Sequence, residues 1–167
     1  EKLLERCRAD VVVDFSVADA CLGMASVAAS HGLHLVIGTT GLTEADLATM
    51  SDLSARNRVG ILVAPNFALG AVVLSHLASL ASRFFEYADI FEAHHEAKID
   101  APSGTAMAIA KAVVAGKGTS FLAPQPEKEL LPGTRDGVTD GVVIHSSRMP
   151  GRVAHHELVF GTLGQTL

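Results

Sequence analysis

The densest run of chemically useful side chains lies between Glu92 and Thr105. It holds the adjacent imidazoles of His94 and His95 and, a few residues later, the ammonium group of Lys98 with Asp100 available to hold or tune it. Imidazole and ammonium groups exchange protons and attract anions. Consecutive strand residues point to opposite faces, so both histidines can face one site only if their strand ends there. The polar residues that follow predict such an end.

The last residues of this run predict an anion site. Ser103, Gly104 and Thr105 begin a predicted helix, where unsatisfied backbone N–H groups and the positive end of the dipole meet. Gly104 lets a ligand approach the backbone closely. Two imidazoles, an ammonium group and a helix N-terminus suit a carboxylate-bearing substrate that exchanges a proton. The residues alone leave an alternative open, in which the histidines are solvated strand-end residues and Ser103 is an ordinary N-cap.

A second histidine pair, His155 and His156, raises further hypotheses. With His94 and His95 it could supply imidazole ligands to a metal, as in a metal-dependent hydrolase. Neither pair has helical i,i+4 spacing and adjacent strand histidines splay apart, so we predict no metal site. His155 and His156 then form either a polar face at a subunit contact or part of the substrate site.

Two loops have the composition of contacts to a flat ligand such as a nucleotide. Gly38-Thr39-Thr40-Gly41 follows one predicted strand, and Ala64-Pro65-Asn66-Phe67 follows another. Their hydroxyl and backbone N–H groups are hydrogen-bond donors. A tight strand-to-helix turn explains the first loop equally well, and Asn66 could cap the helix that follows the second.

The first 66 residues alternate strand and helix. Short β-branched runs predict strands at 10–15, 33–37 and 59–64, and capping-box patterns at 16–19 and 43–46 predict helices that end near His31 and Arg58. Such alternation with short loops predicts a right-handed parallel α/β layer. Ligands of these sheets lie beyond the carboxyl ends of the strands, where both loops fall.

The pattern after residue 66 predicts an α+β domain. We expect a long apolar helix at 67–85, a strand at 87–93, a helix from Pro102 to about Val114, and a long mobile loop at 116–137. The runs 138–148 and 152–160 predict two antiparallel strands joined by a Pro150-Gly151 turn. The predicted fold class is α/β: a partial Rossmann-like parallel sheet in 1–66, followed by an α+β domain in 67–167 with an open mixed or antiparallel sheet.

Composition excludes several classes of protein. The 167 residues are 49% hydrophobic and 19% charged, which excludes disorder as the main state. A net charge of −5 without a Lys/Arg block excludes nucleic acid and anionic membranes as favoured partners. Cys7 and Cys21 form no CxxC motif and no signal-peptide pattern opens the chain, so we expect a reducing, cytoplasmic location. The low charged fraction predicts apolar surface that a partner subunit or missing chain covers.

The run from Glu92 to Thr105 has the pattern Glu-x-His-His-x-x-Lys-x-Asp-x-Pro-Ser-Gly-Thr, which resembles the signature of the dihydrodipicolinate reductase family. The loops at 38–41 and 64–70 resemble two further loops of that family, in the same order. The resemblance covers nearly the whole chain except 116–137. It implies reduction of the cyclic imine 4-hydroxy-tetrahydrodipicolinate to tetrahydrodipicolinate, with NADPH or NADH, on the diaminopimelate route to lysine.

The resemblance also implies roles for individual residues. His94 falls on the family's proton donor and acceptor, and Lys98 on its second proton donor. The implied contacts to the substrate carboxylates are His95, Ser103, Gly104 and Thr105. The implied contacts to the nicotinamide cofactor are Phe15, Gly38, Thr39, Thr40, Ala64, Pro65, Asn66 and Phe67. The resemblance further implies a homotetramer built through the sheet of the second domain.

The sequence departs from the family pattern at both ends. No G-x-G-x-x-G phosphate loop occurs, the chain starts in a predicted helix that should follow that loop, and residues 164–167 stop inside another expected strand. We therefore expect a chain truncated at both ends, which lacks the first strands of its dinucleotide-binding domain and the C-terminal end of its substrate-binding domain. Such a fragment should bind dinucleotide weakly and be inactive, although its parent is a competent reductase. The alternative is a non-catalytic carboxylate-binding or assembly module.

Overall fold

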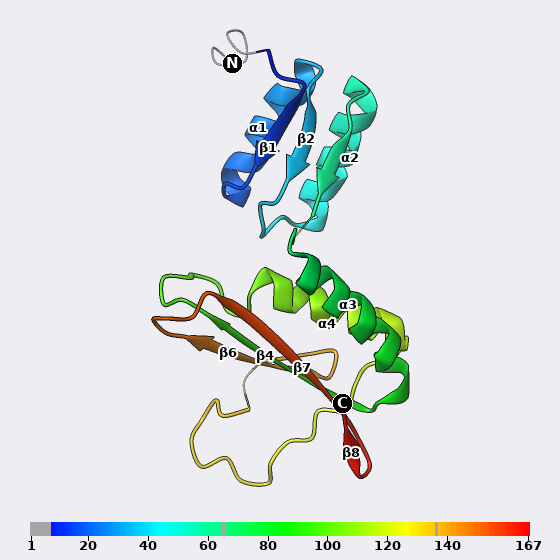
Figure 1. Ribbon diagram of the computed structural model, residues 1–167, viewed down its shortest axis with the longest axis vertical. Coiled ribbons are helices and arrows are strands. Elements are labelled where there is room, and N and C mark those ends of the chain that lie inside the picture. Colours follow the sequence, from blue (N-terminus) through cyan, green and yellow to red (C-terminus); the bar gives the residue numbers. More distant parts are fainter. Residues whose placement is uncertain (1–7, 65, 136) are drawn as a thin grey trace. The chain divides into compact units, whose positions relative to one another are not determined.

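The chain forms two compact units that divide between Phe67 and Ala68 (Figure 1). A computed structural model describes residues 8–64, 66–135 and 137–167. Among these residues, no helix is both long and apolar enough to cross a membrane. Each unit is described separately below.

The first unit is a three-stranded parallel sheet with two helices, as the alternating pattern predicted. Its strands are β1 (Val11–Asp14), β2 (His34–Ile37) and β3 (Ile61–Val63), in that order across the sheet, and its helices are α1 (Ala18–Ser30) and α2 (Glu44–Asn57). Leu35 and Ile37 of β2 are buried against Cys21 and Ala25 of α1 and Met50 of α2. The central strand therefore carries the core of this unit.

The two predicted capping boxes of the first unit have different outcomes. The Thr43 box is confirmed, since its hydroxyl accepts from Asp46 N–H at 3.2 Å and the Asp46 carboxylate accepts from Thr43 N–H at 2.7 Å. The Ser16 box is wrong, because Ser16 N–H donates to Asp14 Oδ1 at 3.1 Å and α1 begins two residues later. The N-cap is Val17, whose apolar side chain offers no capping atom. The buried Asp14 carboxylate thus holds Ser16 outside the helix.

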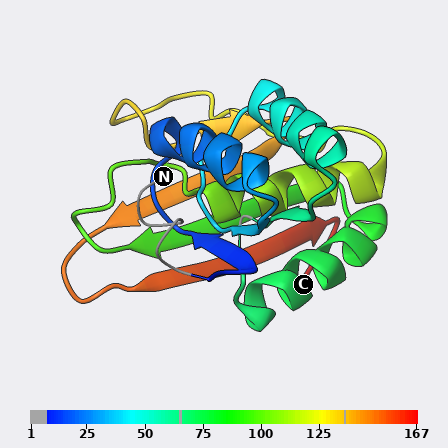
Figure 2. The same ribbon diagram turned by 90° about the horizontal axis from the view of Figure 1, so that it is seen from above.

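The second unit is a five-stranded mixed sheet with two α-helices over one face (Figures 1 and 2). Its sheet has the order β5-β6-β4-β7-β8. The elements are α3 (Leu69–Ala81), the 3₁₀ turn η1 (Ser82–Phe84), β4 (Tyr87–His94), α4 (Gly104–Lys117), β5 (Gly137–Thr139), β6 (Val142–Arg148), β7 (Ala154–Thr162) and β8 (Gln165–Thr166).

The strand predicted at 138–148 is instead the β5–β6 hairpin. Asp140 and Gly141 have φ values of 49° and 81°, and this pair of residues favours a two-residue hairpin turn. A Cβ at Gly141 would lie 1.8 Å from the Phe121 carbonyl oxygen, so the turn requires glycine.

The predicted hairpin between the runs 138–148 and 152–160 is also wrong, because β6 and β7 do not pair with each other. Strands β6 and β7 run in opposite directions, but β4 lies between them, parallel to β6 and antiparallel to β7. Every second residue of β4 is buried, which suits a strand with one face packed on the helices and the other face open.

The helix boundaries of the second unit differ from the prediction at four places, one of which is the start of α4 at Gly104 instead of Pro102. Asn66 is not the cap of the long helix, which begins at Leu69 after Ala68 and ends at Ala81 before η1. Helix α4 continues to Lys117, because Gly118 adopts a φ of 79° and ends it only there. The connection that follows is correspondingly shorter than the predicted loop, and its mobility stays a prediction.

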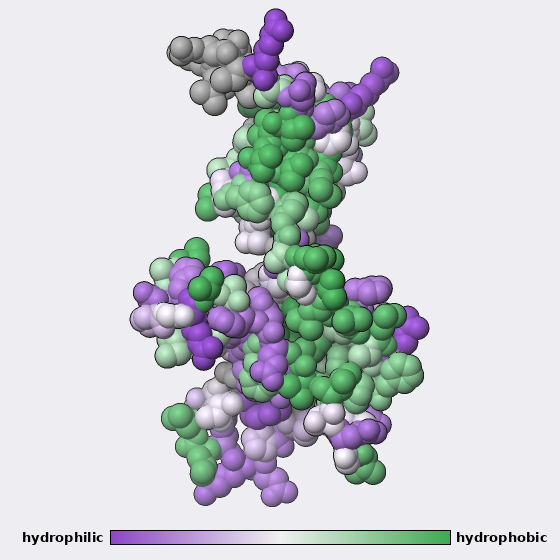
Figure 3. Space-filling model, in the orientation of Figure 1, coloured by the Kyte–Doolittle hydropathy of each residue, from purple (hydrophilic) through white to green (hydrophobic). Residues whose placement is uncertain are grey.

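The two faces of the second sheet differ in what covers them. Ala88, Ile90, Glu92 and His94 of β4 are buried on the face toward the helices, whereas Phe91 points to the open face. The helix-facing core also includes Ile109, Ala110 and Val113 of α4, Val142 and Ile144 of β6, and Phe160 of β7. The outer side of α3 and η1 leaves an apolar patch exposed, formed by Leu69, Val72, Val73, Leu77, Leu80 and Phe84 (Figure 3).

Candidate functional site

A buried ion pair joins the carboxyl ends of two parallel strands. Glu92, whose side chain is 0% exposed, lies near the end of β4, and Arg148 is the last residue of β6. The guanidinium group donates from Nη2 to Glu92 Oε1 at 2.8 Å and from Nη1 to Oε2 at 3.0 Å. The pair forms because β4 and β6 run parallel, which places His94 beside Arg148 in the register.

The Glu92 carboxylate has further partners besides Arg148. His94 Nδ1 lies 2.5 Å from Oε2, and Ser103 N–H donates to Oε1 at 3.3 Å. Burial by itself raises the pKa of Glu92, but hydrogen bonds from Arg148, Ser146 and His94 outweigh burial and lower the pKa to about 2. Glu92 is therefore an ionised carboxylate that accepts hydrogen bonds at both oxygens.

The start of α4 joins this network through His156 of β7. Ser103 is the N-cap of α4, and its hydroxyl accepts from Ala106 N–H at 3.2 Å. The same hydroxyl lies 3.1 Å from His156 Nε2. The rings of His94 and His156 meet edge to face with centroids 5.4 Å apart. Burial lowers the pKa of His156, and its closeness to His94 lowers that pKa further.

Lys98 is held at the edge of the same network. Its Nζ lies 2.6 Å from Asp100 Oδ1, which is the contact expected from the sequence. Arg148 Nη2 donates to the Asp100 carbonyl oxygen at 2.6 Å, which ties this loop to β6. Burial raises the pKa of Asp100, but the hydrogen bond from Lys98 outweighs it and the pKa is lowered.

The structure brings some of the predicted catalytic and substrate residues together. His94 and Ser103 share Glu92, and Lys98 reaches the same network through Asp100 and Arg148. Gly104 and Thr105 are the first two residues of α4 and are half-buried. The side chain of His95 is exposed beyond the end of β4 and, within the described residues, makes no contact with this network. Both hydrogen-bonding groups of Ser103, its N–H and its hydroxyl, are already engaged.

Sequence reasoning gave Arg148 no role and left the role of His156 open. A lone arginine near the end of a strand carries no sequence signal. Its partner Glu92 is 56 residues away, and only the parallel pairing of β4 with β6 joins the two. The predicted hairpin between β6 and β7 left no place for β4 beside β6, so the pairing of β4 with β6 was not predicted.

The predicted cofactor residues lie in the first unit, beyond the carboxyl ends of its strands. The exposed rings of Phe15 and Phe67 lie with centroids 5.4 Å apart. Gly38 follows β2, and a Cβ there would lie 2.1 Å from the Phe15 ring. Thr40 is exposed, Ala64 and Asn66 are half-buried, and Pro65 lies outside the described residues.

Thr39 differs from its neighbours because its side chain points inward. It is 4% exposed, and its hydroxyl donates to Asp14 Oδ2 at 2.9 Å. Asp14 also accepts from Ser16 N–H, so its carboxylate joins the ends of β1 and β2. Thr39 therefore presents only its backbone to a ligand.

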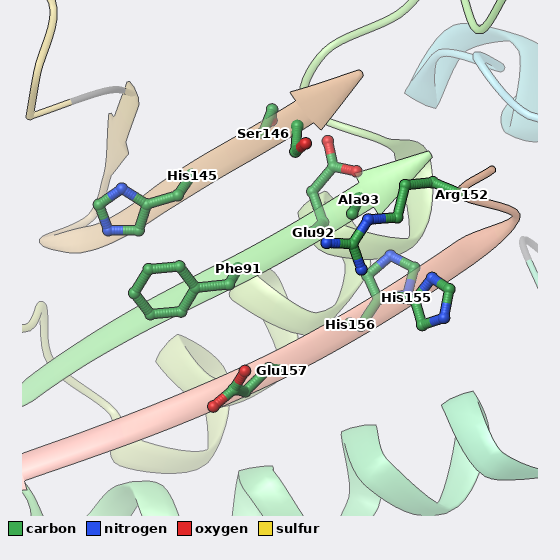
Figure 4. A pocket seen from close by; sticks show the side chains of 10 residues that line it. Phe91, Glu92, Ala93, His145, Ser146, Arg152, His155, His156 and Glu157 are labelled. Carbon is green, nitrogen blue, oxygen red and sulfur yellow. The ribbon is translucent and has the colours of Figure 1, made fainter. Parts of the chain in front are cut away.

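The open face of the second sheet carries a groove of about 510 Å³. Figure 4 shows Phe91 of β4 and His145 of β6 side by side in it, and their rings stack with centroids 4.4 Å apart. His145 Nε2 also lies 3.3 Å from Asp89 Oδ2. The lining residues are Phe91, Glu92, Ala93, His145, Ser146, Ser147, Arg152, His155, His156 and Glu157.

The second histidine pair is divided between the two faces. His156 lies opposite Glu92 in the strand register and bonds Ser103 on the helix side, whereas His155 lies opposite Ala93. In the described parts of the chain, no group of three or more His, Cys, Asp or Glu side chains is arranged to hold a metal ion.

Both units match profiles of one family. The profile described as "Dihydrodipicolinate reductase, N-terminus" matches residues 1–67, and "Dihydrodipicolinate reductase, C-terminus" matches residues 70–167. The chain is 44% identical over 165 residues to proteins named 4-hydroxy-tetrahydrodipicolinate reductase from Dehalococcoides mccartyi (strain BAV1) and Moorella thermoacetica. These alignments cover 99% of this chain but 62% and 61% of the relatives, so the chain spans about three fifths of their length.

A solved structure shows the same likeness. The dipicolinate-bound dihydrodipicolinate reductase from Paenisporosarcina sp. TG-14 is 38% identical, with a TM-score of 0.76 over 99% of this chain and 63% of that one. The profiles, sequence relatives and solved structure agree across both units. On these grounds, the chain belongs to the dihydrodipicolinate reductase family.

Proposed function

We propose that this family member reduces 4-hydroxy-tetrahydrodipicolinate to tetrahydrodipicolinate with a nicotinamide cofactor, in the biosynthesis of diaminopimelate and lysine. One observation carries the proposal: His94, held by the buried Glu92–Arg148 pair, lies in one network with the N-terminus of α4. This arrangement combines a proton donor with an anion site, and a family relative is described as dipicolinate-bound.

The substrate is a dianion, so the site must supply positive partners for two carboxylates. Gly104 is the first residue of α4, where N–H groups and the helix dipole favour an anion, and Thr105 follows it. The exposed His95 offers an imidazole to the other carboxylate. Ser103 supports this site indirectly, because its N–H donates to Glu92 and its hydroxyl accepts from Ala106 N–H in the helix cap.

His94 and Lys98 are the proposed proton donors. Reduction of a conjugated imine builds negative charge toward nitrogen, and a positioned cationic acid lowers the barrier. His94 is held by Glu92 and Lys98 by Asp100, so each donor has a carboxylate partner that orients it.

The first unit fits the nicotinamide half of the cofactor. Two exposed aromatic rings, Phe15 and Phe67, form an apolar surface, and Gly38 leaves the backbone beside Phe15 uncovered. We propose that Phe15, Gly38, Thr39, Thr40, Ala64, Pro65, Asn66 and Phe67 hold this part of NADPH or NADH, Thr39 through its backbone. When bound, the cofactor supplies the hydride, and the protein orients and protonates the substrate.

The open face of the second sheet suits the proposed homotetramer. Phe91, His145 and Val138 leave partly exposed apolar and aromatic surface there, which contact with other subunits would cover. The cytoplasmic location stays a prediction from the composition.

The experiment that tests the proposal is a calorimetric titration of the folded chain with pyridine-2,6-dicarboxylate, a planar analogue of the substrate. We expect saturable binding that the double substitution His95→Ala, Thr105→Ala abolishes. His145→Ala is the matched control, because it removes an imidazole from the opposite face of the sheet and should leave binding unchanged. A folded chain that binds no dicarboxylate would contradict the site assignment.

A second measurement separates the enzyme from a non-catalytic carboxylate-binding module. Both would bind the analogue, but only the enzyme, assayed at the full length of its relatives, would oxidise NADPH when the cyclic imine is supplied. His94→Gln should then remove most of the turnover while dicarboxylate binding persists.

A further inference from the structure

We propose that Glu92 is a positioning residue for His94: its carboxylate holds the imidazole proton on Nδ1 and leaves Nε2 as the nitrogen that exchanges protons with a ligand. The inference rests on the proposed function only for the identity of that ligand. The assignment of the proton follows from the contacts of Glu92 alone.

The partners of Glu92 fix the direction of each hydrogen bond. Oε1 accepts from Arg148 Nη2 and Ser103 N–H, while Oε2 accepts from Arg148 Nη1 and faces His94 Nδ1. An ionised carboxylate is an acceptor only. His94 Nδ1 must therefore carry the hydrogen in this contact, in the neutral and in the cationic ring.

Burial makes this constraint strong. The Glu92 side chain is 0% exposed and that of His94 is 10% exposed, so water offers little competition for the contact. Arg148 supplies the counter-charge that keeps the carboxylate ionised, and it lies on another strand from the histidine that Glu92 orients. Arg148 therefore acts on His94 through Glu92.

The other groups facing His94 are compatible with this assignment. The ring of His156 in β7 meets the His94 ring edge to face. Its Nε2 is engaged with the Ser103 hydroxyl at the start of α4. Lys98 is paired with Asp100 in the loop after β4. Among the described residues, Glu92 is the only carboxylate that contacts the His94 ring.

Substitution of Glu92 by glutamine should reverse the tautomer. Arg148 and Ser103 N–H offer only donors. Two of them meet at the position of Oε1 and one, Arg148 Nη1, lies at the position of Oε2, so we expect the amide oxygen at the position of Oε1. The amide NH₂ then occupies the position of Oε2 and donates to His94 Nδ1. The imidazole proton must move to Nε2.

The test is long-range ¹H–¹⁵N correlation spectroscopy of the chain with ¹⁵N-labelled histidine, at about pH 9, where an ordinary imidazole is neutral. Protonated and unprotonated ring nitrogens give well-separated ¹⁵N signals, and the His94 signals are identified by their loss in His94→Asn. We expect Nδ1 to be protonated in the wild-type chain and Nε2 to be protonated in Glu92→Gln.

Asp89→Asn is the matched control. Asp89 is a carboxylate on the same strand that lies near His145 on the opposite face, so this change should leave the His94 signals unmoved. A wild-type chain with the proton on Nε2, or with an even mixture, would overturn the proposal, whether or not Glu92→Gln folds. Unchanged His94 signals in a folded Glu92→Gln variant would also overturn it.

A dicarboxylate titration in the same sample separates this proposal from the proposed function. If both hold, pyridine-2,6-dicarboxylate should shift the Nε2 signal of His94 more than the Nδ1 signal. The expected tautomer without any response to the dicarboxylate would support the role of Glu92 and count against the proposed ligand.

Discussion

Each unit buries a carboxylate near the carboxyl end of its first strand, yet the two carboxylates have different partners. Asp14 of β1 is 8% exposed and accepts from Ser16 N–H and the Thr39 hydroxyl. Glu92 of β4 accepts from a guanidinium group and an imidazole. The first set of donors is neutral, and the second is charged or titratable.

Because of this difference, the Asp14 contacts only stabilise the fold, whereas the Glu92 contacts act on a side chain that can exchange protons. Burial raises the pKa of Asp14, but hydrogen bonds from Cys21, Ser16 and Thr39 outweigh it and lower the pKa. The Cys21 thiol beside it has its pKa raised to about 11 by burial and by Asp14, so this cluster changes no charge near neutral pH. Glu92 instead connects a histidine, an arginine and a helix N-terminus, and its charge acts on a group that can exchange protons.

The largest expected effect is that of Arg148→Met. Removal of one partner from a buried ion pair leaves an unpaired charge and costs about 3–5 kcal/mol. Urea unfolding followed by fluorescence of Tyr87, the single tyrosine of a chain without tryptophan, reports on the second unit alone. The paired change Glu92→Leu, Arg148→Met should recover much of the loss, and a single variant that loses under about 1 kcal/mol would contradict a strong pair.

The pH dependence of the second unit should be the next largest effect. The folded pKa of Glu92 is lowered from 4.5 to about 2, so the unfolded chain binds more protons between these values and stability falls as the pH falls through this window. The full difference corresponds to about 3 kcal/mol, present above pH 4.5. Tyr87-monitored urea unfolding at several pH values should show this loss in the wild type. If the free energy of unfolding changes with pH equally in the wild type and in Glu92→Gln, Glu92 is not the cause of the loss.

Asp14→Asn should cost the first unit less, about 1–3 kcal/mol, because it leaves a buried hydrogen-bond donor unsatisfied but no unpaired charge. The reactivity of the buried Cys21 thiol in increasing urea measures this unfolding, in a Cys7→Ser background. The control is Asp19→Asn, which changes an exposed carboxylate in the first turn of α1 and should have little effect. A loss of unfolding free energy as large as that of Arg148→Met would show that the neutral Asp14 cluster stabilises its unit as much as the Glu92–Arg148 pair stabilises the other.

The smallest expected effect is that of Ser103→Ala, about 1 kcal/mol for the lost N-cap of α4. Thr43→Ala, the matched change at the exposed cap of α2, should cost its own unit less, because Ser103 also holds His156 and is 2% exposed. Tyr87 fluorescence and Cys21 reactivity report on the two variants respectively. A larger loss for Thr43→Ala would contradict a special role for the buried cap.

Local sequence was sufficient for most of the elements that carry the candidate site. Strand β4 ends at His94, one residue beyond the predicted end, and α4 starts at Gly104, two residues after the predicted start. The Asp140-Gly141 turn was also present in the sequence, as a hairpin signal that was not recognised. The Ser16 prediction failed because of a competing local bond: Asp14, two residues earlier in the chain, accepts from the amide that a capping box would have used.

The pairs that make the site a network depended on the tertiary structure. Glu92 and Arg148 are 56 residues apart, and Ser103 and His156 are 53 apart. Periodicity reports which residues of a strand share a face, but it does not report which strand lies beside it. The sequence therefore determined which side chains were available for proton exchange and anion binding. The register of β4 against β6 and β7 decided which of them meet, because contacts between distant strands depend on sheet order and not on local pattern.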